Sequence, residues 1–239
     1  MTPRARYDGH ADWYDERFRH YGRPDGSAGV LARLLGPPGA TGRICVDVGC
    51  GTGLHVPVLR RLGWTVVGLD ASGDQLRLAA TRADAVLLAD AARLPLADGS
   101  VPAAVMTFVH TDLDDFPAAV AELARILQPG GRLVCLGVHP CFVGAFADRG
   151  DEAGPRRVVL GPGYGDETRR HDPSGRFPMR ARFGVRYLTL GTFLGAFLDQ
   201  PGLRLSGVEE LDSTLRPWRP AAEDGRLVPW NVAVTARAD

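Results

Sequence analysis

The feature that most constrains this chain is an acidic residue at the end of an apolar run, followed at once by a glycine-rich turn: residues 46–53 read Val-Asp-Val-Gly-Cys-Gly-Thr-Gly. Residues 44–48 alternate and are rich in β-branched side chains, which predicts a short buried strand. Gly49, Gly51 and Gly53 lack a Cβ atom, so the turn can adopt positive φ angles and a ligand can approach bare backbone. The segment predicts an α/β fold with a nucleoside-bearing cofactor at the end of this strand.

Two residues of this segment distinguish between cofactors. Nicotinamide-binding turns usually read Gly-x-Gly-x-x-Gly, with the third glycine opening a helix beneath a pyrophosphate. Leu54 stands at that third position here. The Asp47 carboxylate would repel a pyrophosphate but would attract the ammonium or sulfonium of a cationic amino-acid cofactor. The charge therefore favours S-adenosylmethionine, and the expected cofactor contacts of this segment are Asp47, Gly49, Cys50, Gly51 and Gly53.

Two more carboxylates end apolar runs further along the chain. Asp70 follows residues 64–69 at the distance from the turn where an acidic residue accepts the two ribose hydroxyls of a nucleoside. Asp90 ends the next run, where we expect it to bind the adenine amino group. The small residues Ala71 and Ala91 follow the two carboxylates and are expected beside the cofactor. In the alternative interpretation Asp70 or Ser72 only caps a helix, and Asp90 is a turn residue.

These segments resemble the motifs of the class I S-adenosylmethionine-dependent methyltransferases, in the order of that family and across residues 40–138. The matching motifs are residues 46–53, residues 68–72, Asp90-Ala91 with residues 94–100, and residues 127–133. One departure is Val101, where relatives of this type often carry Phe. The resemblance implies S-adenosylmethionine as cofactor, S-adenosylhomocysteine as product, and a last strand that runs antiparallel between its neighbours.

The apolar pattern predicts a single α/β domain with a Rossmann-like, doubly wound, mostly parallel seven-stranded sheet in a three-layer α/β/α sandwich. Strands are expected near residues 43–48, 65–69, 85–89, 103–109, 131–138, 203–210 and 229–236, and helices near 54–62, 73–82, 116–127 and 191–199. Within the domain we expect an amino-terminal arm (1–35), a cofactor-binding core (40–138), a substrate-cover insertion (139–190) and a carboxyl-terminal part (191–239).

Composition excludes several other functions. The formal net charge is zero, and no basic stripe stands out in the core half, which argues against a nucleic-acid substrate. Cys45, Cys50, Cys135 and Cys141 show no metal-ligand spacing and are expected to be reduced thiols. No apolar run approaches the roughly 20 residues of a membrane span. We therefore expect a cytoplasmic protein with a small-molecule substrate and without a bound metal or a membrane partner.

Three segments are expected to form the substrate side. In the arm, Tyr7 is expected at the substrate and Tyr14 over the cofactor, although an amphipathic helix packed on the domain explains the aromatic stripe as well. The insertion is rich in Gly, Pro and Arg, with His171 within it, and its arginines are either solvated or hold an anionic substrate. Trp218, between the last two strands, either lines an apolar pocket or packs the hairpin.

Two histidines stand at strand tips and are candidates for a general base, because imidazole titrates near neutral pH. His110 follows the fourth strand, and His139 follows the fifth and is also a candidate substrate contact. In the alternative interpretation His110 contacts the cofactor through its backbone and His139 holds the insertion by a hydrogen bond.

The sequence thus predicts an enzyme that moves a methyl group to an oxygen, nitrogen or carbon atom of a small molecule in specialised metabolism. Two alternatives remain. One is an S-adenosylmethionine-binding protein of the same fold that catalyses a non-methylating reaction or serves as a binding module. The other is an NAD-dependent oxidoreductase.

Overall fold

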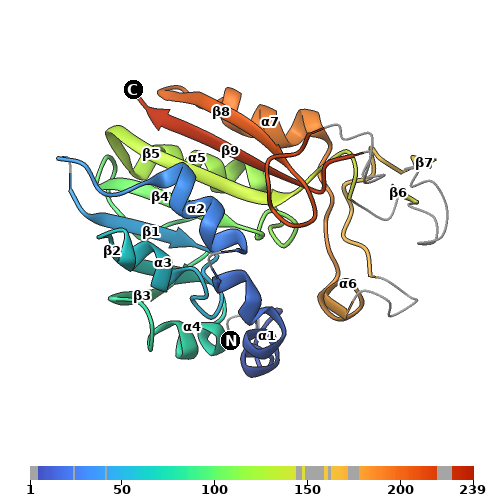
Figure 1. The fold of residues 1–239 in the computed structure, drawn as a ribbon, viewed down its shortest axis with the longest axis horizontal. Helices are drawn as coiled ribbons and strands as arrows, with labels where there is room; N and C mark the ends of the chain where they lie inside the picture. Colours follow the sequence, from blue (N-terminus) through green and yellow to red (C-terminus); the bar gives the residue numbers. More distant parts are fainter. Residues whose placement is uncertain are drawn as a thin grey trace.

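The computed structural model describes residues 5–23, 25–40, 42–143, 147–148, 159–160, 163–171, 178–219 and 228–239. Its centre is a seven-stranded sheet in the order β3-β2-β1-β4-β5-β9-β8 (Figure 1). The strands are β1 (Ile44–Val48), β2 (Thr65–Asp70), β3 (Ala85–Leu88), β4 (Val101–Thr107), β5 (Leu127–Val138), β8 (Leu203–Leu211) and β9 (Asn231–Ala238). Strands β1 to β5 pair in parallel, whereas β9 runs antiparallel to both β5 and β8. The predicted sheet, with its antiparallel last strand, is confirmed.

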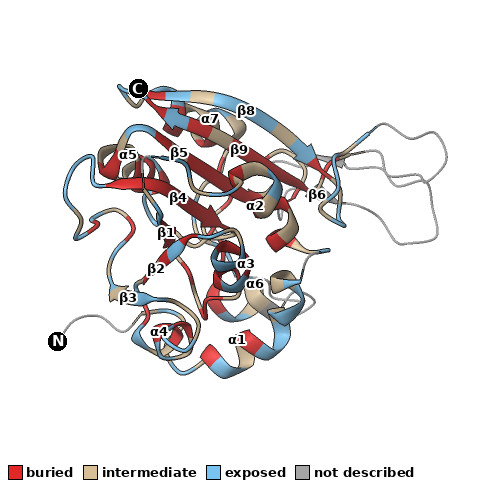
Figure 2. Cartoon of the chain, turned by 60° about the vertical axis from the view of Figure 1, so that its left-hand side comes forward, coloured by how far each residue is buried: buried red, intermediate tan, exposed pale blue. Residues whose placement is uncertain are grey.

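Helices cover both faces of the sheet because successive strand residues point to opposite sides, and in the central strands β1 and β4 most of them are apolar. On one face lie α2 (Ser27–Leu35), α3 (Val56–Arg61) and α4 (Gly73–Ala79), packed on residues such as Cys45 and Val66. On the other face lie α5 (Phe116–Ile126) and α7 (Leu190–Leu198), whose Phe116, Phe193 and Phe197 are fully buried (Figure 2). This is the predicted three-layer sandwich.

Three shorter helical segments lie beyond the carboxyl ends of the parallel strands: α1 (Ala11–Phe18), the 3-10 helix η1 (Arg19–Gly22) and α6 (Pro178–Phe183) (Figure 1). A small separate pair, β6 (Ala147–Asp148) with β7 (Val159–Leu160), belongs to the insertion. Ligands on doubly wound sheets bind at this edge. The arm and the insertion therefore approach the edge where a cofactor is expected.

Some element boundaries differ from the predicted ones for local reasons. Helix α3 begins at Val56 instead of Leu54, because residues 50–55 form successive turns before a proline enters the first helical turn. Strand β4 ends at Thr107, since Phe108 adopts a φ of 56°. Strand β5 already begins at Leu127, which pairs with Val101 across an irregular register.

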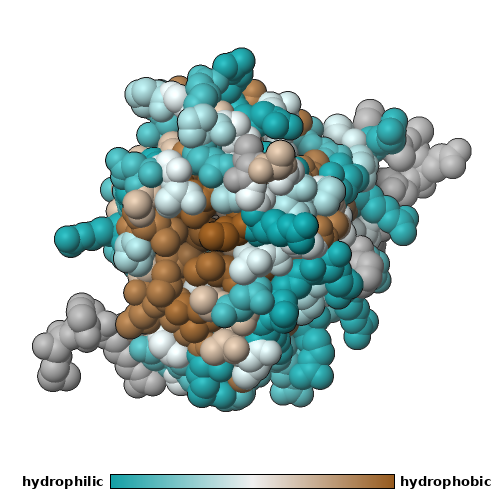
Figure 3. All heavy atoms as spheres, turned by 90° about the vertical axis from the view of Figure 1, so that its left-hand side faces the viewer, coloured by the Kyte–Doolittle hydropathy of each residue, from teal (hydrophilic) through white to brown (hydrophobic). Residues whose placement is uncertain are grey.

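The connection from β3 to β4 contains no helix, and its residues 89–100 form turns and bends. As a result Val67, Leu87, Ala89 and Leu96 are only partly buried against the core, and Leu88 on the edge strand is 67% exposed. Figure 3 shows hydrophobic residues gathered on the side of the molecule where β3 forms the edge of the sheet.

Candidate cofactor and substrate site

The glycine turn lies where the sequence predicts it, at the carboxyl end of β1. Gly49, Gly51 and Gly53 have φ angles of 68°, 54° and 78°. The backbone N–H groups of Gly49 and Cys50 donate to the Leu69 carbonyl at 2.8 and 3.0 Å, which ties the turn to β2. The Cys50 side chain packs toward Gly68, so it is the backbone of this turn that is available to a ligand.

Asp47 is the most unusual residue of the site. It is fully buried at the end of β1, and among the described residues neither of its carboxylate oxygens has a hydrogen-bond partner. Burial, reinforced by the nearby Asp70 carboxylate, raises the pKa of Asp47 to about 7. An unpaired buried carboxylate is costly, and a cation that also donates hydrogen bonds removes that cost.

Asp70 closes the turn from the side of β2. Its two carboxylate oxygens accept from the backbone N–H groups of Gly51 at 2.8 Å and Ser72 at 2.9 Å. Burial raises the pKa of Asp70, and these hydrogen bonds oppose that rise. Ser72 is the amino-terminal cap of α4, because its hydroxyl accepts from Gln75 N at 3.3 Å. Asp70 is therefore held in place beside the turn, with lone pairs left for two ribose hydroxyls; that contact stays a prediction.

The adenine-side residues occupy a tight turn after β3. Asp90 is exposed, and its carboxylate accepts from Ala92 N at 3.0 Å, as in the turn interpretation. Ala91 is buried and Ala71, after β2, is exposed. The contacts predicted for these three residues also stay predictions.

The amino-terminal arm covers the glycine turn. A Cβ atom placed on Gly51 would lie 3.7 Å from the Tyr14 ring, which is therefore close to the turn. The Tyr7 ring lies edge-on to that of Tyr14, with 5.8 Å between the centroids. The Tyr7 hydroxyl donates to Asp112 Oδ1 at 2.9 Å, and the Tyr7 ring stacks on Phe183 of α6 at 4.1 Å. The arm thus contacts both the cofactor turn and the insertion.

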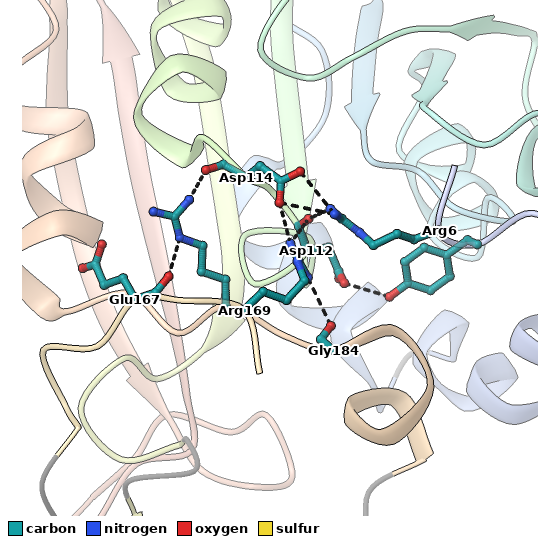
Figure 4. Close-up of polar contacts among 8 residues, drawn as sticks. Arg6, Asp112, Asp114, Glu167, Arg169 and Gly184 are labelled. Carbon is teal, nitrogen blue, oxygen red and sulfur yellow. Dashed lines mark hydrogen bonds and ion pairs between the residues drawn. The ribbon is translucent and has the colours of Figure 1, made fainter. Parts of the chain in front are cut away.

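A clasp of charged groups, which we define as Arg6, Arg169, Arg186, Asp112 and Asp114, joins the arm and the insertion to the loop after β4 (Figure 4). Arg6 and Arg169 both donate to the Asp114 carboxylate and to the Asp112 carbonyl, and Arg169 also donates to the Gly184 carbonyl. Arg186 donates to the carbonyls of Asp114 and Glu167. Arg169 and Arg186 of the insertion thus bind other groups of the protein. The sequence-based alternatives were arginines that are solvated or that hold an anionic substrate.

Asp112 is the functional candidate that the sequence analysis missed. One carboxylate oxygen is held by Tyr7, and the other makes no hydrogen bond within the described residues. Burial raises the pKa of Asp112 to about 6, although the Tyr7 hydrogen bond and the two arginines act against that rise. The available signal was the same as for Asp47, Asp70 and Asp90: a carboxylate just beyond a strand tip.

His110 lies inside the molecule. Its ring is edge-on to Phe116 and Phe193, and a Cβ atom on Gly137 would lie only 2.2 Å from its Cε1. Burial lowers the pKa of His110 to about 4, and its Nδ1 has no partner. The ring is thus neutral and packed against the aromatic core.

His139 is held through both ring nitrogens. Nδ1 accepts from Cys141 N at 3.1 Å, so Nε2 carries the proton and donates to Glu210 at 3.0 Å. Burial lowers its pKa, while Glu210 opposes the shift. These bonds connect the start of the insertion to β8, as in the alternative interpretation; a catalytic role for either histidine stays a prediction.

The remaining two candidates lie in loops. His171 is exposed and its ring lies against Gly184. Trp218 is partly buried beside β8, where its backbone N–H donates to the Glu210 carbonyl at 2.8 Å and its indole Nε1 has no partner. Their substrate contacts stay predictions.

Comparison with known proteins agrees with this geometry. Residues 46–135 match the family model described as a methyltransferase domain. This part of the chain is similar to the class I S-adenosylmethionine-dependent methyltransferases. The matched residues run from the strand before the glycine turn into β5.

Curated relatives match the same part of the chain. A demethylmenaquinone methyltransferase of Thermus thermophilus is 38% identical over 109 residues, which cover 42% of this chain and 50% of the relative. A malonyl-[acyl-carrier protein] O-methyltransferase of Serratia marcescens is 37% identical over 105 residues, which cover 43% and 41%. The chain thus spans half or less of the length of these relatives.

A crystal structure of an S-adenosylmethionine-dependent methyltransferase from Mesorhizobium loti has the same fold, with a TM-score of 0.67 and 23% identity. The match covers 96% of this chain and 98% of that chain. Among the described residues, His, Cys, Asp and Glu side chains form no group of three or more that would hold a metal. Within the same residues, every helix falls short of the length or hydropathy that a membrane crossing requires.

Proposed function

We propose that the protein transfers the methyl group of S-adenosylmethionine to an oxygen, nitrogen or carbon atom of a small molecule and releases S-adenosylhomocysteine. The observation that carries this proposal is the Asp47 carboxylate, buried below the glycine turn with both oxygens unpartnered. An ammonium group supplies both the positive charge and the hydrogen-bond donors that this carboxylate lacks. The pyrophosphate of a dinucleotide would place more negative charge beside it, which argues against an NAD-dependent oxidoreductase.

The bound cofactor supplies an electrophilic methyl group on a sulfonium, so the protein mainly has to bind, align and exclude water. In this proposal Asp47 holds the ammonium, Asp70 holds the ribose hydroxyls, and the bare backbone of the glycine turn allows close approach. Tyr7, Tyr14 and Phe183 form an apolar cover over the acceptor side. The clasp holds that cover closed while the acceptor is in line with the methyl group.

Where the acceptor must lose a proton, we propose that the Asp112 carboxylate accepts it as the general base. Its free carboxylate oxygen and its pKa of about 6 suit a base that is ionised near neutral pH. His110 is less suitable, because an imidazole with a pKa of about 4 binds a proton weakly. His139 is less suitable because both of its nitrogens are already engaged.

The acceptor is proposed from the relatives. Their names describe methylation of demethylmenaquinone, which has a flat quinone ring system, and of an oxygen of malonyl-[acyl-carrier protein], whose malonyl group carries a carboxylate. The aromatic cover of Tyr7, Tyr14 and Phe183 supports a flat ring more than a carboxylate, because planar rings pack on aromatic faces. A role in specialised metabolism remains part of this proposal.

The test is calorimetric titration with S-adenosylmethionine and S-adenosylhomocysteine, using wild type, Asp47→Asn and Asp70→Ala. We expect micromolar binding to wild type and at least a tenfold loss in each variant, since each removes a charge-assisted contact. If wild type binds the cofactor, a second experiment measures S-adenosylhomocysteine formation with a demethylmenaquinol analogue and with malonyl-acyl carrier protein as acceptors. Absence of cofactor binding to wild type would overturn the proposal. Cofactor binding and product formation without S-adenosylhomocysteine would favour the non-methylating alternative.

A further inference from the structure

Another buried polar side chain faces the glycine turn. Gln75, in the first turn of α4, is 2% exposed, and neither its amide oxygen nor its amide nitrogen makes a hydrogen bond within the part of the chain that the structure describes. A Cβ atom on Gly51 would lie 3.6 Å from Gln75 Oε1, so the amide approaches the middle of the turn. Buried amides are almost always hydrogen-bonded, and the exceptions call for an explanation.

The surroundings of Gln75 define what it can bind. Tyr14 approaches Gly51 from the same region, at 3.7 Å from the same Cβ position, and its hydroxyl makes no hydrogen bond to a described residue. Burial raises the pKa of Tyr14 far above its usual value, so this hydroxyl remains a neutral donor. The amide of Gln75 and the hydroxyl of Tyr14 are therefore two free donors on the turn.

The nearby arginines are already engaged. Arg77 pairs with Asp12 and Asp74, and Arg82 pairs with Asp15 and donates to the Thr52 carbonyl. The amino-acid end of the proposed cofactor carries one ammonium and one carboxylate. Asp47 suits the ammonium, so the carboxylate needs donors from elsewhere, and neutral donors serve where arginines are committed.

We propose that Gln75 and Tyr14 hold the carboxylate of the cofactor's methionine end, with Asp47 holding its ammonium. The inference rests on the proposed function, because it assumes S-adenosylmethionine as the ligand. Since neither amide atom of Gln75 has a partner to lose, the side chain can turn its N–H groups toward the carboxylate without breaking a hydrogen bond. Gln75 thus makes the site selective for an intact amino-acid end.

The test compares S-adenosylmethionine with decarboxylated S-adenosylmethionine, which lacks only the carboxylate, and with 5′-methylthioadenosine, which lacks the amino-acid chain and the sulfonium charge. Gln75→Leu is expected to weaken S-adenosylmethionine binding roughly 10- to 100-fold, the range of a charge-assisted hydrogen bond. Binding of the two ligands without a carboxylate is expected to change less than about 2-fold. Tyr14→Phe is expected to show the same selectivity.

Gln75→Glu provides a variant of nearly the same shape. The added carboxylate repels that of S-adenosylmethionine, so the loss of affinity is expected to exceed that of Gln75→Leu. Decarboxylated S-adenosylmethionine, which keeps its ammonium, is expected to bind at least as well as it binds to wild type. Gln200, whose amide donates to the Ala196 carbonyl after α7, supplies the control Gln200→Leu, with no expected change in binding.

Three results would overturn the inference. Equal weakening of all three ligands by Gln75→Leu and Gln75→Glu would place Gln75 at the adenosine end or in the packing of α4. Unchanged binding of all three would remove it from the cofactor site. Binding of decarboxylated S-adenosylmethionine that falls along with S-adenosylmethionine would indicate an ammonium contact instead. Failure of wild type to bind S-adenosylmethionine would overturn the proposed function itself, which is a separate result.

Discussion

Replacing Asp47 by Asn is expected to stabilise the ligand-free protein while it weakens cofactor binding. Burial raises the Asp47 pKa from its usual 3.8 to about 7. A carboxyl group with a raised pKa destabilises the fold increasingly as pH rises from about 4 to about 7, and by a constant amount above that. At 1.36 kcal/mol per pKa unit the cost is about 4 kcal/mol at pH 8 and about 1.5 kcal/mol at pH 5.

Asn is neutral at both pH values, so the variant does not have this cost. Its buried amide carries a pH-independent cost of about 1–3 kcal/mol, because its donors also lack partners. The net gain at pH 8 is therefore expected at about 1–3 kcal/mol. The amide cost cancels when the two pH values are compared. The free energy of unfolding of the variant, relative to that of wild type, should therefore rise by about 2–3 kcal/mol from pH 5 to pH 8.

The assay is urea unfolding of wild type and Asp47→Asn at pH 5 and pH 8, with Asp199→Asn, at an exposed carboxylate, as the control. Calorimetry in two buffers of different ionisation enthalpy adds a second reading at pH 6. Wild type is expected to release a proton when S-adenosylmethionine binds, because the ammonium draws Asp47 into its ionised form. The reasoning is refuted if the stability difference is the same at both pH values and no proton is released.

Three further substitutions test the core, the clasp and the histidines. Gly137→Ala places a methyl group against the His110 ring, so we expect it to destabilise the fold by about 1–3 kcal/mol in urea unfolding. In a His110→Ala background the same substitution should cost clearly less, because the ring that it clashes with is absent. Asp114→Asn weakens two exposed ion pairs of the clasp and should speed dissociation of S-adenosylhomocysteine about 2- to 5-fold, as measured by stopped-flow fluorescence. The control Asp98→Asn also breaks an exposed ion pair with an arginine, but it should leave this dissociation rate unchanged. His110→Ala and His139→Ala are each expected to lower the melting temperature and to leave the rate of methyl transfer nearly unchanged. A large loss of rate at an unchanged melting temperature would instead support that histidine as the base.

The cofactor half of the molecule could be predicted because each of its signals is local. Glycines with positive φ, a strand rich in β-branched residues and a carboxylate at a strand tip all follow from neighbours in the chain. The cap of α5 is also local, since Asp115 accepts from Ala118 N at 2.9 Å, three residues along the chain. The boundary of β4 was missed because the left-handed conformation of Phe108 has no signature in its side chain.

The substrate half could not be predicted in the same way, because its contacts join distant segments. Tyr7 meets Asp112 across 105 positions of the chain, and Arg6 meets Asp114 across 108. Several of these bonds also end on backbone carbonyls, such as that of Asp112, which any residue supplies. An arginine-rich segment therefore predicts that charges will be paired, without indicating which groups pair with them.

Asp47 and Gln75, two of the polar side chains left unpartnered at the glycine turn among the described residues, link stability to function in this molecule. The side chains of Asp47 and Gln75 are each almost completely buried without a hydrogen bond to a described residue, although most side chains of the core are apolar. A ligand-free fold gains nothing from such groups and would be more stable with apolar side chains in their places. A ligand with one cationic and one anionic group at the same end would pair with both and would reverse that cost. The cost is therefore best explained as preorganisation for that ligand, and stability gained by Asp47→Asn without any loss of cofactor affinity would contradict this explanation.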